Sequence, residues 1–269
     1  MKGLASVLGV ILLSGCAALA GPLEVSIGGG VSAVSLDAYN GILESWNALI
    51  EHLNETFLVH PDVSGTVRTL DLLSNGMGFQ VAEWYWPLGW LALGARFEYE
   101  QSKTATRGTY VGAGTSTIDI ALEWQTIGVL AGARFLILDA GVRLSGDLAL
   151  GYFHGALAHS VTFEVPSEYT DALAGLPPEG GGRHTGDTVG LAAQLSVDVP
   201  IAAGLGLGAA VGYRSAVIGA LTDASDASGD PLDLDGDETS EEANLSGIGV
   251  RLTLSFDIDL SLDGEGEKE

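Results

Sequence analysis

The feature that most constrains the fold is an alternation that runs from Ile248 to Leu262. Eight apolar residues at even positions alternate without a break with glycine, polar and charged residues at odd positions. A period of two predicts a β-strand with one apolar face and one polar face. At about 3.3 Å per residue this strand spans roughly 50 Å, about twice the usual length in globular proteins. Such a strand favours a closed barrel with lipid outside and a polar interior.

The composition agrees with a chain whose hydrophobic residues are spread over many strands. Of the 269 residues only 17% are charged and 39 are glycine, and the mean hydropathy is +0.30. No segment after the N-terminal region is apolar enough for a transmembrane helix, and the length suits one large all-β domain. The net charge is −24 with a pI near 4.2, which argues against nucleic acid as a partner because phosphate contacts need clustered lysine and arginine.

The N-terminus predicts export from the cytoplasm. Lys2 precedes the apolar run Leu4 to Leu13, and Ala18-Leu19-Ala20 provides the small-x-small pattern of a signal-peptide cleavage site. This interpretation makes residues 1–20 a signal peptide. An alternative uses the one cysteine of the chain: the sequence before Cys16 is similar to a bacterial lipobox, which would end a lipoprotein signal at residue 15 and acylate Cys16.

A helix is predicted between the first two strands. After an alternating strand from Leu23 to Val34, apolar residues from Leu36 to Leu53 recur at intervals of three and four, which is typical of an amphipathic helix. Its polar face is acidic and lacks lysine and arginine, which disfavours an anionic lipid surface. We expect this helix to pack as a cap on the barrel rim; an interfacial helix and a docking site for a partner protein are the alternatives.

Six further segments alternate with a period of two. They are Gly76 to Trp86, Gly89 to Gln101, Thr117 to Ile137, Val142 to Val165, Thr188 to Val199 and Gly204 to Ile218. The alternation changes phase near Gln125 to Gly128, which predicts a β-bulge, and again around Phe153 to Leu157. Trp84, Tyr85, Trp86 and Trp90 crowd one turn, where they are expected to form an interfacial aromatic girdle.

The connections between these eight strands alternate in length. Long ones follow strands one, three, five and seven, including the loops Ser102 to Ser116 and Pro166 to Gly186, whereas short turns follow strands two, four and six. In this respect the chain resembles the OmpA/OmpX-type class of eight-stranded outer-membrane barrels. The resemblance implies an all-β fold: an eight-stranded antiparallel up-and-down transmembrane β-barrel over residues 21–262, with one amphipathic helix in the first long loop and an acidic tail at 263–269. No family motif is matched, and the chain lacks the terminal aromatic residue common in this class.

Charged residues on the strands are expected to face the interior, because charge on the lipid face costs about 2–4 kcal/mol near the midplane. An eight-stranded barrel is just wide enough for side chains to fill it. We therefore predict a charge-paired plug; a solute path lined by the same residues is the alternative. The residues are Arg96, Glu98, Glu100, Asp119, Glu123, Arg134, Arg143, Asp147, Asp198, Arg214, Arg251, Asp257 and Asp259.

The acidic loop from Asp223 to Glu242 holds nine carboxylates and no cation. Asp233, Asp235 and Asp237 follow the start of a calcium-loop pattern, but Glu238 replaces the glycine at its sixth position and Asn244 the glutamate at its twelfth. The loop is therefore interpreted as a solvated acidic segment, with weak calcium binding as the alternative. No other cofactor is expected.

The five histidines show no metal-ligand spacing, and no catalytic motif is present. We therefore expect a non-enzymatic barrel in the bacterial outer membrane that contacts its lipid and has a structural or envelope-integrity role. One alternative is a narrow porin or solute channel. The other is an exported soluble β-barrel that binds an apolar ligand. The sequence names no partner protein.

Overall fold

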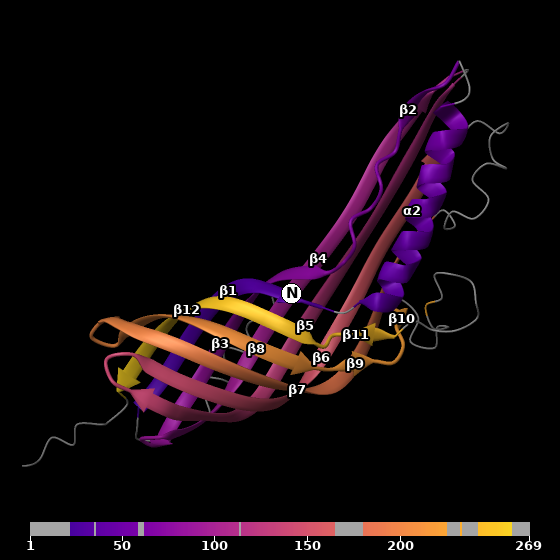
Figure 1. Cartoon of the computed structure of the whole chain (residues 1–269). Coiled ribbons are helices and arrows are strands. Elements are labelled where there is room, and N and C mark those ends of the chain that lie inside the picture. Colours follow the sequence, from indigo (N-terminus) through magenta and orange to yellow (C-terminus); the bar gives the residue numbers. More distant parts are fainter. Residues whose placement is uncertain are drawn as a thin grey trace, which may run out of the picture.

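The computed structural model describes residues 22–34, 36–58, 62–112, 114–164, 180–224, 232 and 242–259. Most of them lie in long strands, and one helix, α2 (Asp37–Leu58), runs beside these strands (Figure 1). Among the described residues no helix is long and apolar enough to cross a bilayer. The eight long strands are β1 (Pro22–Ala33), β3 (Asn75–Leu88), β4 (Leu91–Val111), β5 (Thr115–Asp139), β6 (Arg143–Glu164), β7 (Gly180–Ala202), β8 (Leu205–Ser215) and β12 (Gly247–Asp259).

The eight long strands form one closed antiparallel ring. Each pairs with its neighbour along the chain from β3 to β8, while β1 pairs with both β3 and β12, and β12 pairs with β8. This confirms the predicted up-and-down barrel. Both ends of the described chain and the three tight turns lie at one end of the barrel, called here the turn end (Figure 1). Four short strands lie outside the ring: β2 (Ser64–Thr66), β9 (Val217–Ile218), β10 (Thr222–Asp223) and β11 (Ala243–Asn244).

The C-terminal strand β12 has the predicted orientation. Leu252 is 71% exposed and Leu254, Phe256 and Ile258 are also exposed, whereas Thr253 and Ser255 are buried inside the ring. The same arrangement holds for the outward apolar residues of β1, β7 and β8. The barrel is therefore apolar outside and polar inside, which is the reverse of a soluble barrel with an apolar ligand pocket.

Four strands continue well beyond the closed ring at the end opposite the turns. This extension, called here the blade, comprises residues 102–111 of β4, 115–126 of β5, 154–164 of β6 and 180–187 of β7 (Figure 1). The predicted loop Ser102 to Ser116 is therefore wrong, because most of it forms a β-hairpin. The last residues of the predicted loop Pro166 to Gly186 likewise belong to β7. Alternating threonines such as Thr104 and Thr106, whose β-branched side chains favour strands, explain the extension.

The predicted β-bulge near Gln125 is also wrong. Strand β5 pairs without a register shift with β4 and with β6 from Thr117 to Phe135, and β6 pairs regularly through Phe153 to Leu157. Side-chain direction therefore stays constant, and what changes is which face is apolar. In the barrel the outward residues such as Val129 are apolar, whereas in the blade the inward residues such as Leu122 are apolar and buried.

Helix α2 covers the inward face of the blade (Figure 1). One apolar cluster joins the helix to β5 and β6, and the rings of Tyr39 and Trp124 lie 6.0 Å apart within it. Each large side chain buried here contributes about 1.5–3 kcal/mol. The helix was predicted, but it packs along the blade instead of across the rim. The cluster includes Leu36, Tyr39, Leu43, Trp46, Ile50, Leu53, Ile118, Ile120, Leu122, Trp124, Leu157 and Val161.

Three asparagines at seven-residue spacing attach the following chain segment to α2. The Oδ1 atoms of Asn40, Asn47 and Asn54 accept the backbone N–H groups of Leu73, Leu70 and Val67 at 2.8, 2.7 and 2.9 Å. Asn47 and Asn54 also donate through Nδ2 to the carbonyls of Leu70 and Val67. Seven helical residues rise about 10.5 Å and three extended residues about 10 Å, so the two spacings match. The side-chain amides thus replace a partner strand for residues 67–73.

Several predictions fall on residues outside the described ranges. Cys16, the signal peptide, the aspartates Asp233, Asp235 and Asp237, and the acidic tail lie there. The lipidation, cleavage and calcium assignments therefore stay predictions.

Candidate functional site

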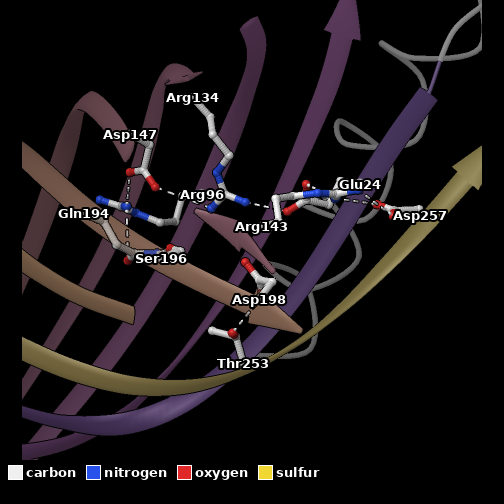
Figure 2. Close-up of polar contacts among 10 residues, drawn as sticks. All are labelled: Glu24, Arg96, Arg134, Arg143, Asp147, Gln194, Ser196, Asp198, Thr253 and Asp257. Atoms are coloured by element: carbon white, nitrogen blue, oxygen red, sulfur yellow. Dashed lines mark hydrogen bonds and ion pairs between the residues drawn. The ribbon is translucent and has the colours of Figure 1, made fainter. Parts of the chain in front are cut away.

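The barrel interior contains a connected set of ion pairs. Nearest its middle, Arg96 Nη1 donates to Asp147 Oδ1 at 2.7 Å, and Arg134 Nη2 lies 3.4 Å from Asp147 Oδ2. Arg134 also donates through Nη1 to Glu24. The side chains of Arg96, Arg134, Asp147 and Glu24 are all at least 97% buried. Figure 2 shows these groups converging from β1, β4, β5 and β6 across the lumen.

Toward the turn end, the same set continues to the edge of the lumen. Arg143 lies 3.5 Å from Glu24 and donates to both carboxylate oxygens of Asp257 at 3.3 Å (Figure 2). Asp198 accepts a hydrogen bond from the Thr253 hydroxyl at 3.4 Å. Asp257 is half-exposed, and Asp259 is exposed at the end of β12, so these two carboxylates lie where the interior meets solvent.

Toward the blade end, a second group of charges surrounds Glu98. Its carboxylate lies 3.0 Å from Arg96 Nε, 3.7 Å from Arg214 and 3.6 Å from Arg251. Arg214 also pairs with Glu100 at 3.0 Å and donates from Nε to the carbonyl of Leu245 at 2.8 Å. The two groups share Arg96, so charge pairing runs nearly the whole length of the lumen.

Two residues of the predicted interior set lie elsewhere. Asp119 and Glu123 are on the outer face of the blade, where Asp119 pairs with the exposed Arg107 at 3.8 Å and Glu123 accepts from Gln101 at 2.9 Å. The prediction that they face inward is wrong because it took Ile118 and Leu122 to be lipid-facing. Those residues are buried beneath α2 instead.

Sequence reasoning missed several interior side chains. Glu24 is an interior partner of two arginines, and Gln194 accepts from Arg96 at 3.4 Å. Trp84, predicted to belong to the aromatic girdle, is buried in the lumen, and the Arg134 guanidinium stacks 4.5 Å from its ring centre. Glu24 lies on the polar face of the first strand, and that position was the available signal. Trp84 and the partly buried Trp86, also predicted for the girdle, share the even positions of the inward-facing Gln80 and Ala82, and that alternation was the signal; Trp90 is exposed as predicted.

Little free space remains around these charges. A cavity of about 20 Å³ lies beside Arg96, Glu98, Arg214 and Arg251, enough for one or two water molecules. A second cavity of about 80 Å³ lies at the turn end beside Arg143, Asp198 and Asp257.

On the outer surface a polar row marks where the apolar face ends. Tyr99, Ile127, His154 and Asp187 pair in register across β4 to β7, and His154 Nδ1 lies 2.7 Å from Asp187 Oδ1. One residue pair further into the blade, hydrogen bonds link polar side chains of neighbouring strands. We call these residues the boundary belt: Tyr99, Gln101, Glu123, Gln125, His154, Arg183 and Asp187.

The apolar surface below the boundary belt has a height close to that of the apolar band of outer-membrane barrels. On β5 it runs from Val129 to Ile137, eight residue steps or about 26 Å along the strand. A strand tilt of about 35–45° shortens this to roughly 20 Å, close to the ≈ 25 Å apolar band of such barrels. The closed ring, this apolar band and the polar lumen define an eight-stranded transmembrane β-barrel, the architecture of small outer-membrane proteins.

Solved structures with a similar fold include three outer-membrane proteins. The outer membrane protein OprG of Pseudomonas aeruginosa is 10% identical, with 89% of this chain and 96% of that chain covered and a TM-score of 0.42. The attachment invasion locus protein Ail of Yersinia pestis is 16% identical, with 89% and 99% covered and a TM-score of 0.38. The outer membrane protease OmpT of Escherichia coli is 9% identical, with 88% and 96% covered and a TM-score of 0.37. No protein-family model and no curated protein matches the chain.

Proposed function

We propose that this protein is a non-conducting barrel of the bacterial outer membrane with a structural role, which holds the blade and α2 outside the bilayer. The observation that carries the proposal is the ion-pair set that crosses the lumen from Asp257 to Glu100. The apolar band and the predicted signal peptide support the outer-membrane location. Short turns then face the periplasm and the blade faces the outside of the cell, as in barrels of this class.

The charged side chains inside the lumen pair with and neutralise one another. Together they act as a plug. Moving an ion past Arg96, Arg134 and Asp147 would require breaking contacts of 2.7 to 3.4 Å between nearly fully buried groups. Removing one partner of such a buried pair costs about 3–5 kcal/mol. These contacts lie between the cavity at the turn end and the cavity beside Glu98, which is only about 20 Å³.

Conductance of the refolded protein in planar bilayers, together with liposome swelling, tests the plug. The wild-type chain should show no steady single-channel current and no swelling with small sugars. A double variant, Arg96→Ala with Asp147→Ala, removes one central pair and should produce brief, small currents. The matched control Arg107→Ala with Asp119→Ala removes an exposed pair on the blade and should stay silent. Steady wild-type conductance would show that the lumen is open.

A narrow channel is the second candidate. The specific observation that favours it is the pair of charge-lined cavities, one near each end of the lumen. In that case the ion pairs would act as a gate, and the wild-type protein would show steady single-channel conductance.

We also infer that the barrel is not an enzyme. The His154–Asp187 pair has the geometry of an acid–base dyad, and the Tyr152 hydroxyl donates to Asp187. This dyad lies on the outer surface at the boundary belt, where Tyr152 faces the apolar band. An interfacial anchoring role, in which aromatic and polar side chains meet the headgroup region, therefore accounts for it. This inference would be contradicted if the wild-type protein cleaves a peptide or a lipid and a His154→Ala variant, which still inserts into bilayers, does not.

A further inference from the structure

Two histidines of the blade form a pair that the proposed function does not use. His159 lies on β6 and His184 on β7, and their rings stack with centroids 5.4 Å apart and an interplanar angle of 19°. Position 159 pairs in register with Gly182, two residues before His184, so the two imidazoles are diagonal neighbours on the inward face of the sheet. Sequence spacing alone missed this pair because the residues are 25 positions apart and meet only through strand pairing.

The Cε1 atoms of both rings and the Nδ1 atom of His184 lie close to Gly182. A methyl group on Gly182 would lie 3.0 Å from His184 Cε1, 3.1 Å from His159 Cε1 and 3.6 Å from His184 Nδ1. Glycine at 182 leaves this space free of side-chain atoms. Glycine is therefore the residue that leaves both rings room at this point, because a methyl group would crowd both Cε1 atoms.

The ring nitrogens at this position lack partners. Neither His159 Nδ1 nor His184 Nδ1 makes a hydrogen bond to any described residue, although both atoms are shielded from solvent. Buried polar atoms in folded proteins are almost always hydrogen-bonded, so each exception requires an explanation. A metal ion, which accepts a nitrogen lone pair, would satisfy such an atom.

The protonation state and the neighbouring strand both suit a cation. An imidazole with the ordinary histidine pKa of about 6.5 is mostly neutral at neutral pH and then has a nitrogen lone pair that can bind a metal. Asp223 on β10 pairs in register with His184, which sets its carboxylate on the same face of the sheet. That negative charge favours a positively charged ligand beside His184.

We propose that His159 and His184 bind a divalent transition-metal ion through their Nδ1 atoms. Imidazole nitrogen suits Cu²⁺, Ni²⁺ and Zn²⁺, and the Irving–Williams order places Cu²⁺ first among them. Among the described residues no group of three or more His, Cys, Asp or Glu side chains is arranged around a metal position. The pair therefore supplies two protein ligands, and solvent completes the coordination. The site lies outside the lumen, so it is independent of the plug.

Cu²⁺ added to the untagged, refolded full-length protein tests the site. Electron paramagnetic resonance should show one bound Cu²⁺ per chain with coupling to two imidazole nitrogens. His159→Gln and His184→Gln should each weaken binding by about 10-fold or more, since even changes to the outer hydrogen-bond partners of metal sites cost 10–100-fold. His52→Gln, on the exposed face of α2, and His154→Gln, at the boundary belt, are matched controls that should bind as the wild type does.

The wild-type spectrum keeps the proposal testable even if a variant fails to fold. A wild-type spectrum with no bound copper, or with coupling to fewer than two nitrogens, would overturn the proposal. The proposal would also be overturned if folded His159→Gln and His184→Gln variants bind copper as tightly as the wild type does, or if His154→Gln abolishes the copper signal. Heat-dependent migration on gels, a property of folded barrels, verifies that each variant has inserted.

Discussion

Trp124 and Val129 lie on one unbroken strand, yet Trp124 is buried on its inward face and Val129 is exposed on its outward face. Both residues are apolar, and only five positions separate them. The apolar face of β5 therefore changes sides within about two residue pairs, and the boundary belt lies at that level on the outer surface. A strand that passes from lipid into water explains this reversal, because lipid favours apolar residues outside and α2 favours them inside.

Asn47→Ala should loosen residues 67–73 without disturbing the barrel. The substitution removes two hydrogen bonds to Leu70, whose N–H and C=O are then left without their partner. Each bond contributes about 0.5–1.5 kcal/mol, so the local loss is about 1–3 kcal/mol. Hydrogen exchange measured by mass spectrometry should accelerate in peptides covering 67–73. Ser45→Ala, which removes an exposed hydroxyl on the same helix, is the control and should leave exchange unchanged.

Arg214→Ala should destabilise the barrel more than Arg251→Ala does. Glu100 makes its one ion pair among the described residues with Arg214, whereas Glu98 keeps Arg96 and Arg214 when Arg251 is lost. Leaving a buried carboxylate without a partner costs up to about 3–5 kcal/mol. Denaturant unfolding in lipid vesicles, followed by tryptophan fluorescence, measures the difference.

A second variant tests the reason for that loss. Adding Glu100→Gln to Arg214→Ala removes the orphaned charge and should recover part of the lost stability. Arg107→Ala, on the exposed face of the blade, should change stability by about 1 kcal/mol or less. Equal losses for Arg214→Ala and Arg251→Ala would contradict the assignment of Glu100 to a single partner.

Acidification should loosen the β6–β7 edge of the blade. Burial lowers the pKa of His159 and His184, with His184 lowering that of His159 further and Asp223 opposing the shift at His184. Below the usual histidine value of about 6.5 the unfolded chain then binds more protons than the folded chain, so stability is lost as pH falls. Hydrogen exchange in residues 154–164 and 180–187, corrected for its intrinsic pH dependence, should rise between about pH 7.5 and pH 5. The double variant His159→Gln with His184→Gln should remove this dependence.

Alkaline titration should find Tyr110 in its protonated form well above the usual range. This ring is buried in the blade, and its hydroxyl donates to Asn54 Oδ1 at 2.6 Å. Burial raises the pKa of Tyr110 to about 12. A Tyr110→Phe variant should lack one late-ionising group in the ultraviolet absorbance titration. If the variant instead lacks one group that ionises near pH 10, the usual tyrosine value, Tyr110 is exposed.

The barrel was predictable because its strands follow one simple rule. In β12 every apolar residue faces lipid, so the alternation alone gives the strand and its orientation. The pairing partners of the interior charges were not predictable. Arg134 contacts Glu24, which is 110 residues away, and such contacts depend on barrel register that no local pattern encodes.

The blade was missed for a physical reason as well. Its inward face is apolar only because α2 covers it, and the strand pattern by itself does not distinguish lipid from a packed helix. Ile118 and Leu122 therefore resembled lipid-facing residues, which put Asp119 and Glu123 on the wrong side. The seven-residue spacing of Asn40, Asn47 and Asn54 was a readable signal, because side chains seven positions apart lie on the same face of a helix.

Single cysteines along the outward face of β5, in a Cys16→Ser background, test the membrane boundary most directly. An environment-sensitive fluorophore attached at positions 117, 119, 121, 129, 131 and 133 reports lipid or water in bilayer vesicles. We predict emission typical of lipid at 129, 131 and 133 and emission typical of water at 117, 119 and 121, with the change at the boundary belt. Emission typical of water at 129, 131 and 133 in inserted protein would contradict the account.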